Sequence, residues 1–118
     1  MAKTVLVVDD QEDVRFSLEK LLKKSGYIVI SAVDGDDCLK KLTEQKVDLI
    51  LLDLMMPGTP VKDIIAHIQD TKIAFFTAVR MSEAEKAQFI QDNKIVYFIQ
   101  KPSNNEEIVN TVKELLAD

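Results

Sequence analysis

The sequence predicts an α/β fold in which a five-stranded parallel sheet lies between two layers of helices. Strand-like apolar runs alternate with helix-like patterns five times from one end of the chain to the other. The runs are almost continuously apolar, as in Val5–Val8, which is typical of parallel strands buried on both faces. Right-handed crossovers between successive strands would place helices on both sides, so we expect a three-layer sandwich.

The first two units have clear beginnings and ends. A strand over Thr4–Val8 is followed by a helix that begins after Asp10 and stops at Ser25-Gly26. A second strand covers about Tyr27–Ala32, and Asp34 then caps the second helix. The inward faces of these helices are apolar at helical spacing: Val14, Leu18, Leu21 and Leu22 in the first, Cys38, Leu39 and Leu42 in the second.

The remaining three units follow the same pattern. The third strand, Leu49–Leu52, leads through a proline-containing loop to a helix, and the last strands cover Ile73–Phe76 and Val96–Gln100. Ser82-x-x-Glu85 and Ser103-x-x-Glu106 read as capping boxes that open the fourth and fifth helices. The apolar stripes are Val61, Ile64, Ile65 and Ile68 in the third helix, and Ile108, Val109, Val112, Leu115 and Leu116 in the fifth. The fourth helix offers only Ala84, Ala87 and Ile90, so we expect it to be loosely held.

Length and composition limit the class of protein. The 118 residues contain no glycine- or proline-rich linker, so we expect one domain over residues 1–118. The single cysteine, Cys38, excludes an intramolecular disulfide and fits a reducing compartment. With no secretory signal pattern and no apolar run of membrane length, a cytoplasmic protein without membrane contact is expected. A net charge of −5 argues against direct binding to nucleic acid.

Polar residues of several kinds follow four of the predicted strands at the point where each strand ends. They are Asp9, Asp10, Asp53, Thr77 and Lys101. If the strands are parallel, these residues gather at the carboxyl edge of the sheet, where open α/β sheets place their sites. The flavodoxin-like strand order 2-1-3-4-5 is compatible with this alternation and would bring Asp10 and Asp53 together at its switch point, although periodicity alone does not select it.

Three carboxylates in one pocket require positive charge. Two carboxylates about 4 Å apart repel by roughly 4 kcal/mol at an effective dielectric constant of 20, and Lys101 supplies only one ammonium. Oxygen ligands without a nearby histidine or thiol favour Mg²⁺, with Mn²⁺ or Ca²⁺ as substitutes, over zinc. The simpler interpretation is that Asp9 and Asp10 only cap the first helix and that Asp53 is a loop residue. The presence of Thr77 and Lys101 at matching strand ends weighs against it.

An aspartate in such a pocket can act as a nucleophile. Aspartate carboxylates form aspartyl-phosphates, and phosphoryl transfer depends mainly on positioning and charge neutralisation. A metal and Lys101 would supply the charge, and Thr77 can donate a hydrogen bond to a phosphoryl oxygen. The only histidine, His67, falls on the third helix, away from this edge, so we expect it to be a surface residue.

These residues resemble the receiver domain of two-component response regulators, in the manner of single-domain chemotaxis regulators. The resemblance covers essentially the whole chain. It is carried by Val7-Val8-Asp9-Asp10, Asp34-Gly35, the run from Asp48 to Gly58, Thr77-Ala78 and Lys101-Pro102. It implies a flavodoxin-like (βα)5 fold with strand order 2-1-3-4-5.

The resemblance also implies a role for each residue of the pocket. Asp53 would be phosphorylated by a sensor histidine kinase or a histidine phosphotransfer protein, and Thr77 and Lys101 would hold the phosphoryl group. Mg²⁺ would be bound directly by Asp10 and Asp53, through water by Asp9, and by the backbone carbonyl of Met55. The Lys101-Pro102 peptide bond would be cis.

Signal output in the family couples Thr77 to an aromatic residue three positions before the lysine, which is Phe98. The simpler alternative is that Phe98 is an ordinary core aromatic, with Tyr97 beside it on the surface. The output surface would be the face of helix four, strand five and helix five, which would bind a downstream protein. Phosphorylation-dependent homodimerisation is left open.

The residues that flank the phosphorylation site affect how long the aspartyl-phosphate persists before water hydrolyses it. The positions two after Asp53 and two after Thr77 are Met55 and Val79, which are apolar and cannot orient an attacking water. We therefore expect slow self-dephosphorylation. The chain departs from the family pattern at Val61, at Asn93-Lys94-Ile95 and at Ser103, all outside the acidic pocket.

Two other functions compete with the phospho-acceptor switch, which would catalyse only its own phosphorylation and dephosphorylation. A metal-dependent phosphatase with an aspartyl nucleophile typically has a second aspartate where Met55 stands, which counts against it. A flavin or nucleotide binder is disfavoured because acidic strand ends repel phosphate and the chain lacks a glycine-rich loop. Phe16, expected near the site, is a candidate kinase-docking residue, or it is partly buried under a loop.

Overall fold

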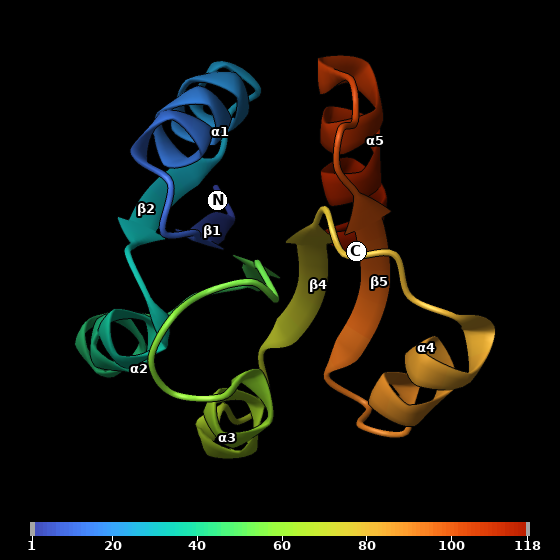
Figure 1. The fold of residues 1–118 in the computed structure, drawn as a ribbon. Helices are drawn as coiled ribbons and strands as arrows, with labels where there is room; N and C mark the ends of the chain where they lie inside the picture. The colour runs from blue at the N-terminus through green and yellow to red at the C-terminus, as the bar shows by residue number, and fades with distance from the viewer. Residues whose placement is uncertain (1, 118) are drawn as a thin grey trace.

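The computed structural model describes residues 2–117 and confirms the five predicted βα units (Figure 1). The strands are β1 (Thr4–Val8), β2 (Ile28–Ala32), β3 (Leu49–Leu52), β4 (Lys72–Thr77) and β5 (Ile95–Gln100). The helices are α1 (Glu12–Lys24), α2 (Gly35–Glu44), α3 (Val61–His67), α4 (Glu83–Ile90) and α5 (Asn105–Leu115).

The five strands form one parallel sheet in the order β2-β1-β3-β4-β5, so the flavodoxin-like order is confirmed. Helices α1 and α5 cover one face, and α2, α3 and α4 cover the other (Figure 1). Successive strand residues point to opposite faces: Val5 and Val7 pack toward α1 and α5, whereas Leu6 and Val8 pack toward α2 and α3. Burial on both faces explains why these strands are apolar throughout.

The second strand begins one residue later than predicted, because Tyr27 takes part in the turn that follows α1. Gly26 has a φ of +99°, in the left-handed region that glycine adopts without strain. The Tyr27 amide then donates to the carbonyl of Leu22, 3.1 Å away. This is the hydrogen bond that closes a helix C-terminus after a glycine, and it takes Tyr27 out of the strand.

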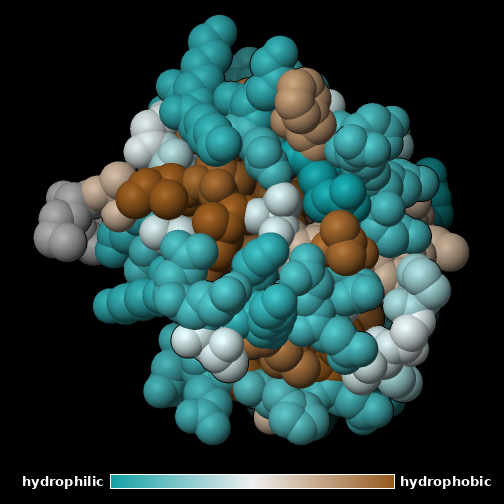
Figure 2. Space-filling view, turned by 90° about the vertical axis from the view of Figure 1, so that its left-hand side faces the viewer, coloured by the Kyte–Doolittle hydropathy of each residue, from teal (hydrophilic) through white to brown (hydrophobic). Residues whose placement is uncertain are grey.

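The strand β2 is an outer edge of the sheet, and Figure 2 shows the side of the molecule on which it lies. Apolar side chains reach the surface there between polar ones. Ile28 in the strand and Val33 just after it are each about half exposed.

The capping box predicted at Ser103 is wrong by one residue. The N-cap of α5 is Asn104, whose side chain accepts a hydrogen bond from the backbone amide of Glu107 at 2.8 Å. Ser103 instead donates from its hydroxyl to the Glu107 carboxylate. The spacing from Asn104 to Glu107 is the same as in the predicted pair, so the sequence offers two overlapping caps. The other box, Ser82 with Glu85, is confirmed, and so is the Asp34 cap of α2.

The predicted inward face of α4 is also wrong. Ala84, Ala87 and Ile90 are exposed, and the half-buried side chains are those of Lys86 and Phe89. The Phe89 ring packs edge-on against Phe75 of β4, with centroids 4.9 Å apart. A large aromatic ring buries more apolar surface than two alanines, so it sets the rotation of the helix. No residue of α4 is fully buried, in keeping with a loosely held helix.

Two departures from the family pattern have local structural roles. Lys94 donates from its ammonium to the carbonyls of Ile65 and Ile68, 2.9 and 2.7 Å away, and so satisfies the C-terminal end of α3. Val61 is the first residue of α3, directly after its N-cap Pro60, and Gly58 turns the preceding loop with a φ of +97°.

Candidate functional site

The structure brings the polar strand ends to one edge of the sheet. Asp9 directly follows β1, Asp53 directly follows β3, Thr77 ends β4 and Lys101 directly follows β5. Backbone hydrogen bonds continue the sheet past the strand ends. The Asp53 amide donates to the Val8 carbonyl at 3.1 Å, and the Lys101 amide donates to the Thr77 carbonyl at 2.8 Å. The backbones of Asp53, Thr77 and Lys101 are therefore held by the sheet itself.

The acidic part of the site consists of three aspartates. Oxygen atoms of Asp9, Asp10 and Asp53 all lie within 4.8 Å of one another. Asp9 and Asp53 are buried, and Asp10 is exposed at the mouth of the group. Within residues 2–117, no hydrogen bond or ion pair engages the Asp10 carboxylate, which leaves it available to a ligand.

Lys101 is the cation that faces these carboxylates. Its ammonium nitrogen lies 2.7 Å from Asp9 Oδ2 and 3.4 Å from Asp53 Oδ2. Its side chain is only 17% exposed, so the attraction is screened less than at the surface. The ammonium also lies 5.0 Å from the centre of the Phe76 ring. One positive charge against three carboxylates leaves the site acidic.

Backbone amides hold the two buried carboxylates in place. The Gln11 amide donates to Asp9 Oδ1 at 3.0 Å, and the Met55 amide donates to Asp53 Oδ1 at 3.1 Å. The N-cap of α1 is Gln11, and it makes no side-chain capping bond. Neither Asp9 nor Asp10 is therefore the N-cap residue of α1, although Asp9 accepts a hydrogen bond from the amide of the N-cap residue. Arg15, from the first turns of α1, donates to the backbone carbonyl of Asp9 at 2.6 Å.

Thr77 lies at the end of β4 and is buried. Its hydroxyl oxygen accepts a hydrogen bond from the amide of Val79 at 3.2 Å, within its own loop. The hydroxyl hydrogen can still be donated to another acceptor. The structure thus brings Thr77 to the same edge as the acidic group, but no hydrogen bond of the described residues joins its hydroxyl to Asp53 or Lys101.

The two adjacent aromatic residues of β5, Tyr97 and Phe98, differ in exposure as the sequence predicts. Tyr97 is exposed, whereas Phe98 is half-buried. The Phe98 ring packs against Phe75, with centroids 5.5 Å apart, and the Lys86 ammonium lies 5.9 Å from its centre. Phe98 is therefore packed against the core and also in contact with α4. The Lys101-Pro102 peptide bond is cis, as the resemblance implies.

Met55 and Val79, the residues two positions after Asp53 and Thr77, differ in exposure. Met55 is 64% exposed at the mouth of the site, and Val79 is half-buried. Phe16 on α1 is exposed, so its alternative of burial under a loop is wrong. Cys38 is fully buried in the core, and burial, with a further contribution from the Asp37 charge, raises the pKa of its thiol to about 12.

The donor set fits a hard divalent cation. The three converging carboxylates offer oxygen ligands, and the exposed Asp10 carboxylate lies beside two buried ones. Magnesium in such a site is held by one or two carboxylates and keeps several waters, which suits a group with one exposed member.

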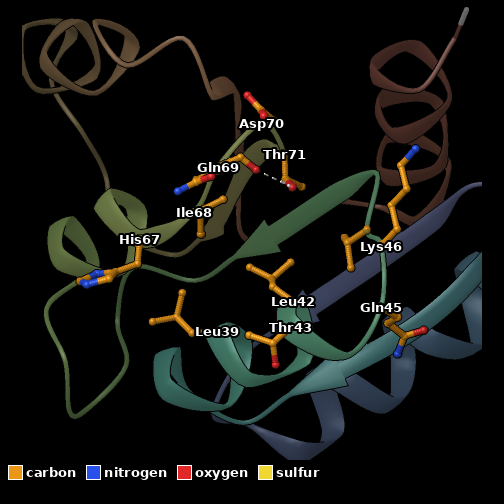
Figure 3. Close-up of a pocket in the computed structure, with 11 residues that line it drawn as sticks. Leu39, Leu42, Thr43, Gln45, Lys46, His67, Ile68, Gln69, Asp70 and Thr71 are labelled. Atoms are coloured by element: carbon orange, nitrogen blue, oxygen red, sulfur yellow. Dashed lines mark hydrogen bonds between the residues drawn. The ribbon is translucent and has the colours of Figure 1, made fainter.

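A cavity that contains none of these polar residues lies elsewhere in the described part of the chain. It has a volume of about 620 Å³ and is lined by the end of α2 and the segment after α3 (Figure 3). His67 lies on its rim, and Leu39 and Leu42 form part of its wall. It lies apart from the carboxyl edge of the sheet, where the polar strand ends gather.

One polar residue at this edge could not be found by sequence reasoning. Gln100, the last residue of β5, directs its side-chain amide at backbone carbonyls of the neighbouring strand ends. A glutamine at the end of an edge strand reads as a solvated residue, and nothing in the pattern indicates these contacts.

A doubly wound sheet in this order, with an acidic pocket and a lysine at its carboxyl edge, fits the class of phospho-acceptor signalling domains. The family model described as the response regulator receiver domain matches residues 5–113, and the chain belongs to this family. Two-component signalling through an aspartyl-phosphate follows from that membership, and the Asp9, Asp10 and Asp53 group fits magnesium and such a phosphoryl group.

Known relatives agree with this assignment. The chain is 37% identical to the transcriptional regulatory protein ResD of Bacillus subtilis over 115 residues, which are 95% of this chain and 47% of ResD. It is 32% identical to the alkaline phosphatase synthesis transcriptional regulatory protein PhoP of the same organism, over 98% of this chain and 49% of PhoP. The chain thus spans about half the length of these curated relatives.

Solved structures of response regulators have the same fold as this chain. The chemotaxis protein CheY4 of Vibrio cholerae superposes with a TM-score of 0.85 at 29% identity, covering 98% of this chain and all of CheY4. The response regulator TrrA of Thermotoga maritima, solved in complex with Mg²⁺ and a beryllofluoride, gives a TM-score of 0.82 at 30% identity, covering 97% and 99% of the two chains. Within residues 2–117 of the present structure, no helix is long and apolar enough to cross a membrane.

Proposed function

We propose that Asp53 is the phospho-acceptor of this receiver domain and that residues 1–118 act as one switch. The observation that carries the proposal is the convergence of buried Asp53 with Asp9, Asp10 and the Lys101 ammonium at the switch point of the sheet. Asp53 is the member of the group that follows the central strand β3, between the metal-type ligands on β1 and the cation after β5.

The phosphoryl donor is a histidine of a sensor kinase or of a histidine phosphotransfer protein. A carboxylate oxygen of Asp53 attacks the phosphorus, a P–O bond forms, the P–N bond to the donor breaks, and the released imidazole takes up a proton. Lys101 and the hydroxyl of Thr77 bind the transferred group. The exposed ring of Phe16 on α1 supports a docking role for this side of the molecule.

Magnesium would be held by Asp10 and Asp53 directly, by Asp9 through water, and by the backbone carbonyl of Met55, with Mn²⁺ or Ca²⁺ as substitutes. When bound, it neutralises negative charge on the phosphoryl oxygens. Asp9 meanwhile keeps the Lys101 ammonium beside Asp53 through their 2.7 Å ion pair.

Output follows from a shift between two packings. Thr77 turns its hydroxyl toward the phosphoryl group, and the Phe98 ring moves into the space that this leaves. The move takes the ring away from Lys86, 5.9 Å from its centre, and so changes the face formed by α4, β5 and α5. That face would bind a downstream protein or a second phosphorylated copy. The net charge of −5 supports a protein partner over nucleic acid. The single free cysteine, Cys38, fits a reducing compartment such as the cytoplasm.

The phosphorylated state should be long-lived. Met55 and Val79 flank the site, and neither side chain can orient a water for attack on the phosphoryl group. The same position of Met55 argues against a multiple-turnover phosphatase, because it leaves no carboxylate there to act as the acid or base.

Acetyl phosphate with Mg²⁺, followed by intact-mass measurement, tests the proposal. The wild type should gain one phosphoryl group, Asp53→Asn should gain none, and Asp63→Asn, which removes an exposed carboxylate of α3, should behave as wild type. Labelling that survives in Asp53→Asn, or continued turnover of acetyl phosphate without a stable adduct, would contradict it.

A further inference from the structure

Gln100 makes a set of contacts beside the proposed phosphoryl site. Its side-chain nitrogen donates to the carbonyls of Ala78 and Lys101 at 3.0 and 3.1 Å, and lies 3.4 Å from that of Thr77. All three partners are acceptors, so the amide nitrogen, not the oxygen, must face them. This side chain therefore joins the ends of β4 and β5.

The groups it joins carry two of the phosphoryl-binding side chains. Ala78 directly follows Thr77 and begins the loop that holds the Thr77 hydroxyl through the Val79 amide. The Lys101 carbonyl belongs to the residue whose ammonium contacts Asp9 and Asp53. The last backbone bond between the strands runs from the Lys101 amide to the Thr77 carbonyl. Gln100 extends this connection beyond the end of the sheet.

We propose that Gln100 is a positioning residue for phosphoryl binding, an inference that rests on the proposed function. By tying the Ala78 and Lys101 carbonyls together, it holds Thr77 and Lys101 at a fixed spacing before the phosphoryl group arrives. Groups that are held in place in advance lose less freedom on binding. The acidic residues follow β1 and β3, and no side-chain hydrogen bond of Gln100 within residues 2–117 reaches them.

The competing interpretation is an exposed glutamine whose hydrogen bonds have no consequence. Exposed bonds exchange readily with water, so the expected effect is small, about three- to tenfold for one or two neutral hydrogen bonds. The two interpretations differ in which ligand is affected. A positioning role weakens phosphoryl binding and leaves the metal unchanged, whereas a general loss of order at this edge weakens both.

The experiment measures two affinities for one variant. Gln100→Met keeps the length of the side chain and removes the donor. Titration with Mg²⁺ alone, followed by amide NMR, should give the wild-type affinity within about twofold. Titration with beryllofluoride at saturating Mg²⁺ should show binding weakened about three- to tenfold. Gln100→Glu should weaken it further, because a carboxylate would face three carbonyls.

Gln69→Met is the matched control, because it removes an exposed glutamine from the loop after α3, at the opposite edge. It should change neither affinity. Equal beryllofluoride binding in wild type and Gln100→Met would overturn the inference, as would tighter binding or a parallel loss of Mg²⁺ affinity. If wild-type protein binds Mg²⁺ but neither beryllofluoride nor a phosphoryl group at Asp53, the proposed function itself fails.

Discussion

Lys101 lies between two buried carboxylates, 2.7 Å from Asp9 and 3.4 Å from Asp53. Removing one member of such a group leaves the other charges without compensation, which costs more than the net value of the pair. A divalent cation bound by the same carboxylates would supply the missing charge. The ammonium and the metal are therefore partly interchangeable in their effect on stability.

Lys101→Met tests this relation. In metal-free buffer we expect the free energy of unfolding to fall by about 2 kcal/mol, because Asp9 and Asp53 then repel each other inside the protein. Saturating Mg²⁺ should remove at least half of this loss. Urea unfolding with and without Mg²⁺ measures both values. A loss that is the same with and without Mg²⁺ would contradict the account.

Met55 bears on the lifetime of the phosphoryl group. Its side chain is 64% exposed, so Met55→Asn should cost less than about 0.5 kcal/mol in stability. The added amide can orient a water near Asp53, and we expect self-dephosphorylation to be about tenfold faster. Loss of the phosphorylated mass over time gives the rate. Ile90→Asn, which changes an exposed apolar residue of α4, is the control and should leave the rate unaltered. Release within seconds from the wild type would show that Met55 and Val79 do not protect the group.

The helices differ in how they are attached to the sheet. Apolar stripes bury α1 and α5 against one face, whereas α4 has no fully buried residue and contacts the core through Phe89. An element with few buried contacts opens at low free energy and suits a surface that must change. In the proposed switch, α4 is the helix that Phe98 contacts.

The cap of α5 provides a test that separates two neighbouring residues. Asn104→Ala should lower the free energy of unfolding by about 1 kcal/mol, because Asn104 satisfies the Glu107 amide. Ser103→Ala should cost clearly less, since it removes only an exposed bond to the Glu107 carboxylate. Urea midpoints of the two variants decide between the caps. The reverse order would restore the Ser103 cap that the sequence predicts.

The elements show which parts of the structure can be predicted from sequence. Burial on both faces makes strands such as Leu49–Leu52 apolar throughout, so the positions of these strands can be predicted from the sequence. The rotation of α4 about its axis cannot be predicted in this way, because it depends on how Phe89 packs against Phe75. The cap of α5 is ambiguous since Ser103 and Asn104 each have a glutamate three residues later. The contacts of Gln100 arise only when β4 and β5 are paired.

The molecule as a whole is held by two apolar clusters, one on each side of the sheet. Cys38 lies in the cluster under α2 and α3 and is fully buried. Its thiol reports on opening of that side, because burial raises its pKa to about 12 and removes it from contact with reagents.

Labelling of Cys38 by a thiol reagent should therefore require opening of the fold. Near pH 8 we expect labelling of the native protein to be at least a thousandfold slower than in urea, where the thiol returns to its ordinary pKa near 8.5. Mg²⁺ with beryllofluoride should slow it further, since ligands that bind only the native state stabilise it. Rapid labelling of the native protein, at the rate seen in urea, would contradict the packing of α2.

The central claim is that one carboxylate, that of Asp53, receives the phosphoryl group. Borohydride reduces an acyl phosphate to an alcohol and so converts a phosphorylated aspartate to homoserine. After reaction with acetyl phosphate and Mg²⁺, peptide mass spectrometry should find homoserine at position 53. Homoserine at position 9 or 10, or a phosphoryl group on a serine, threonine or histidine instead, would contradict the account.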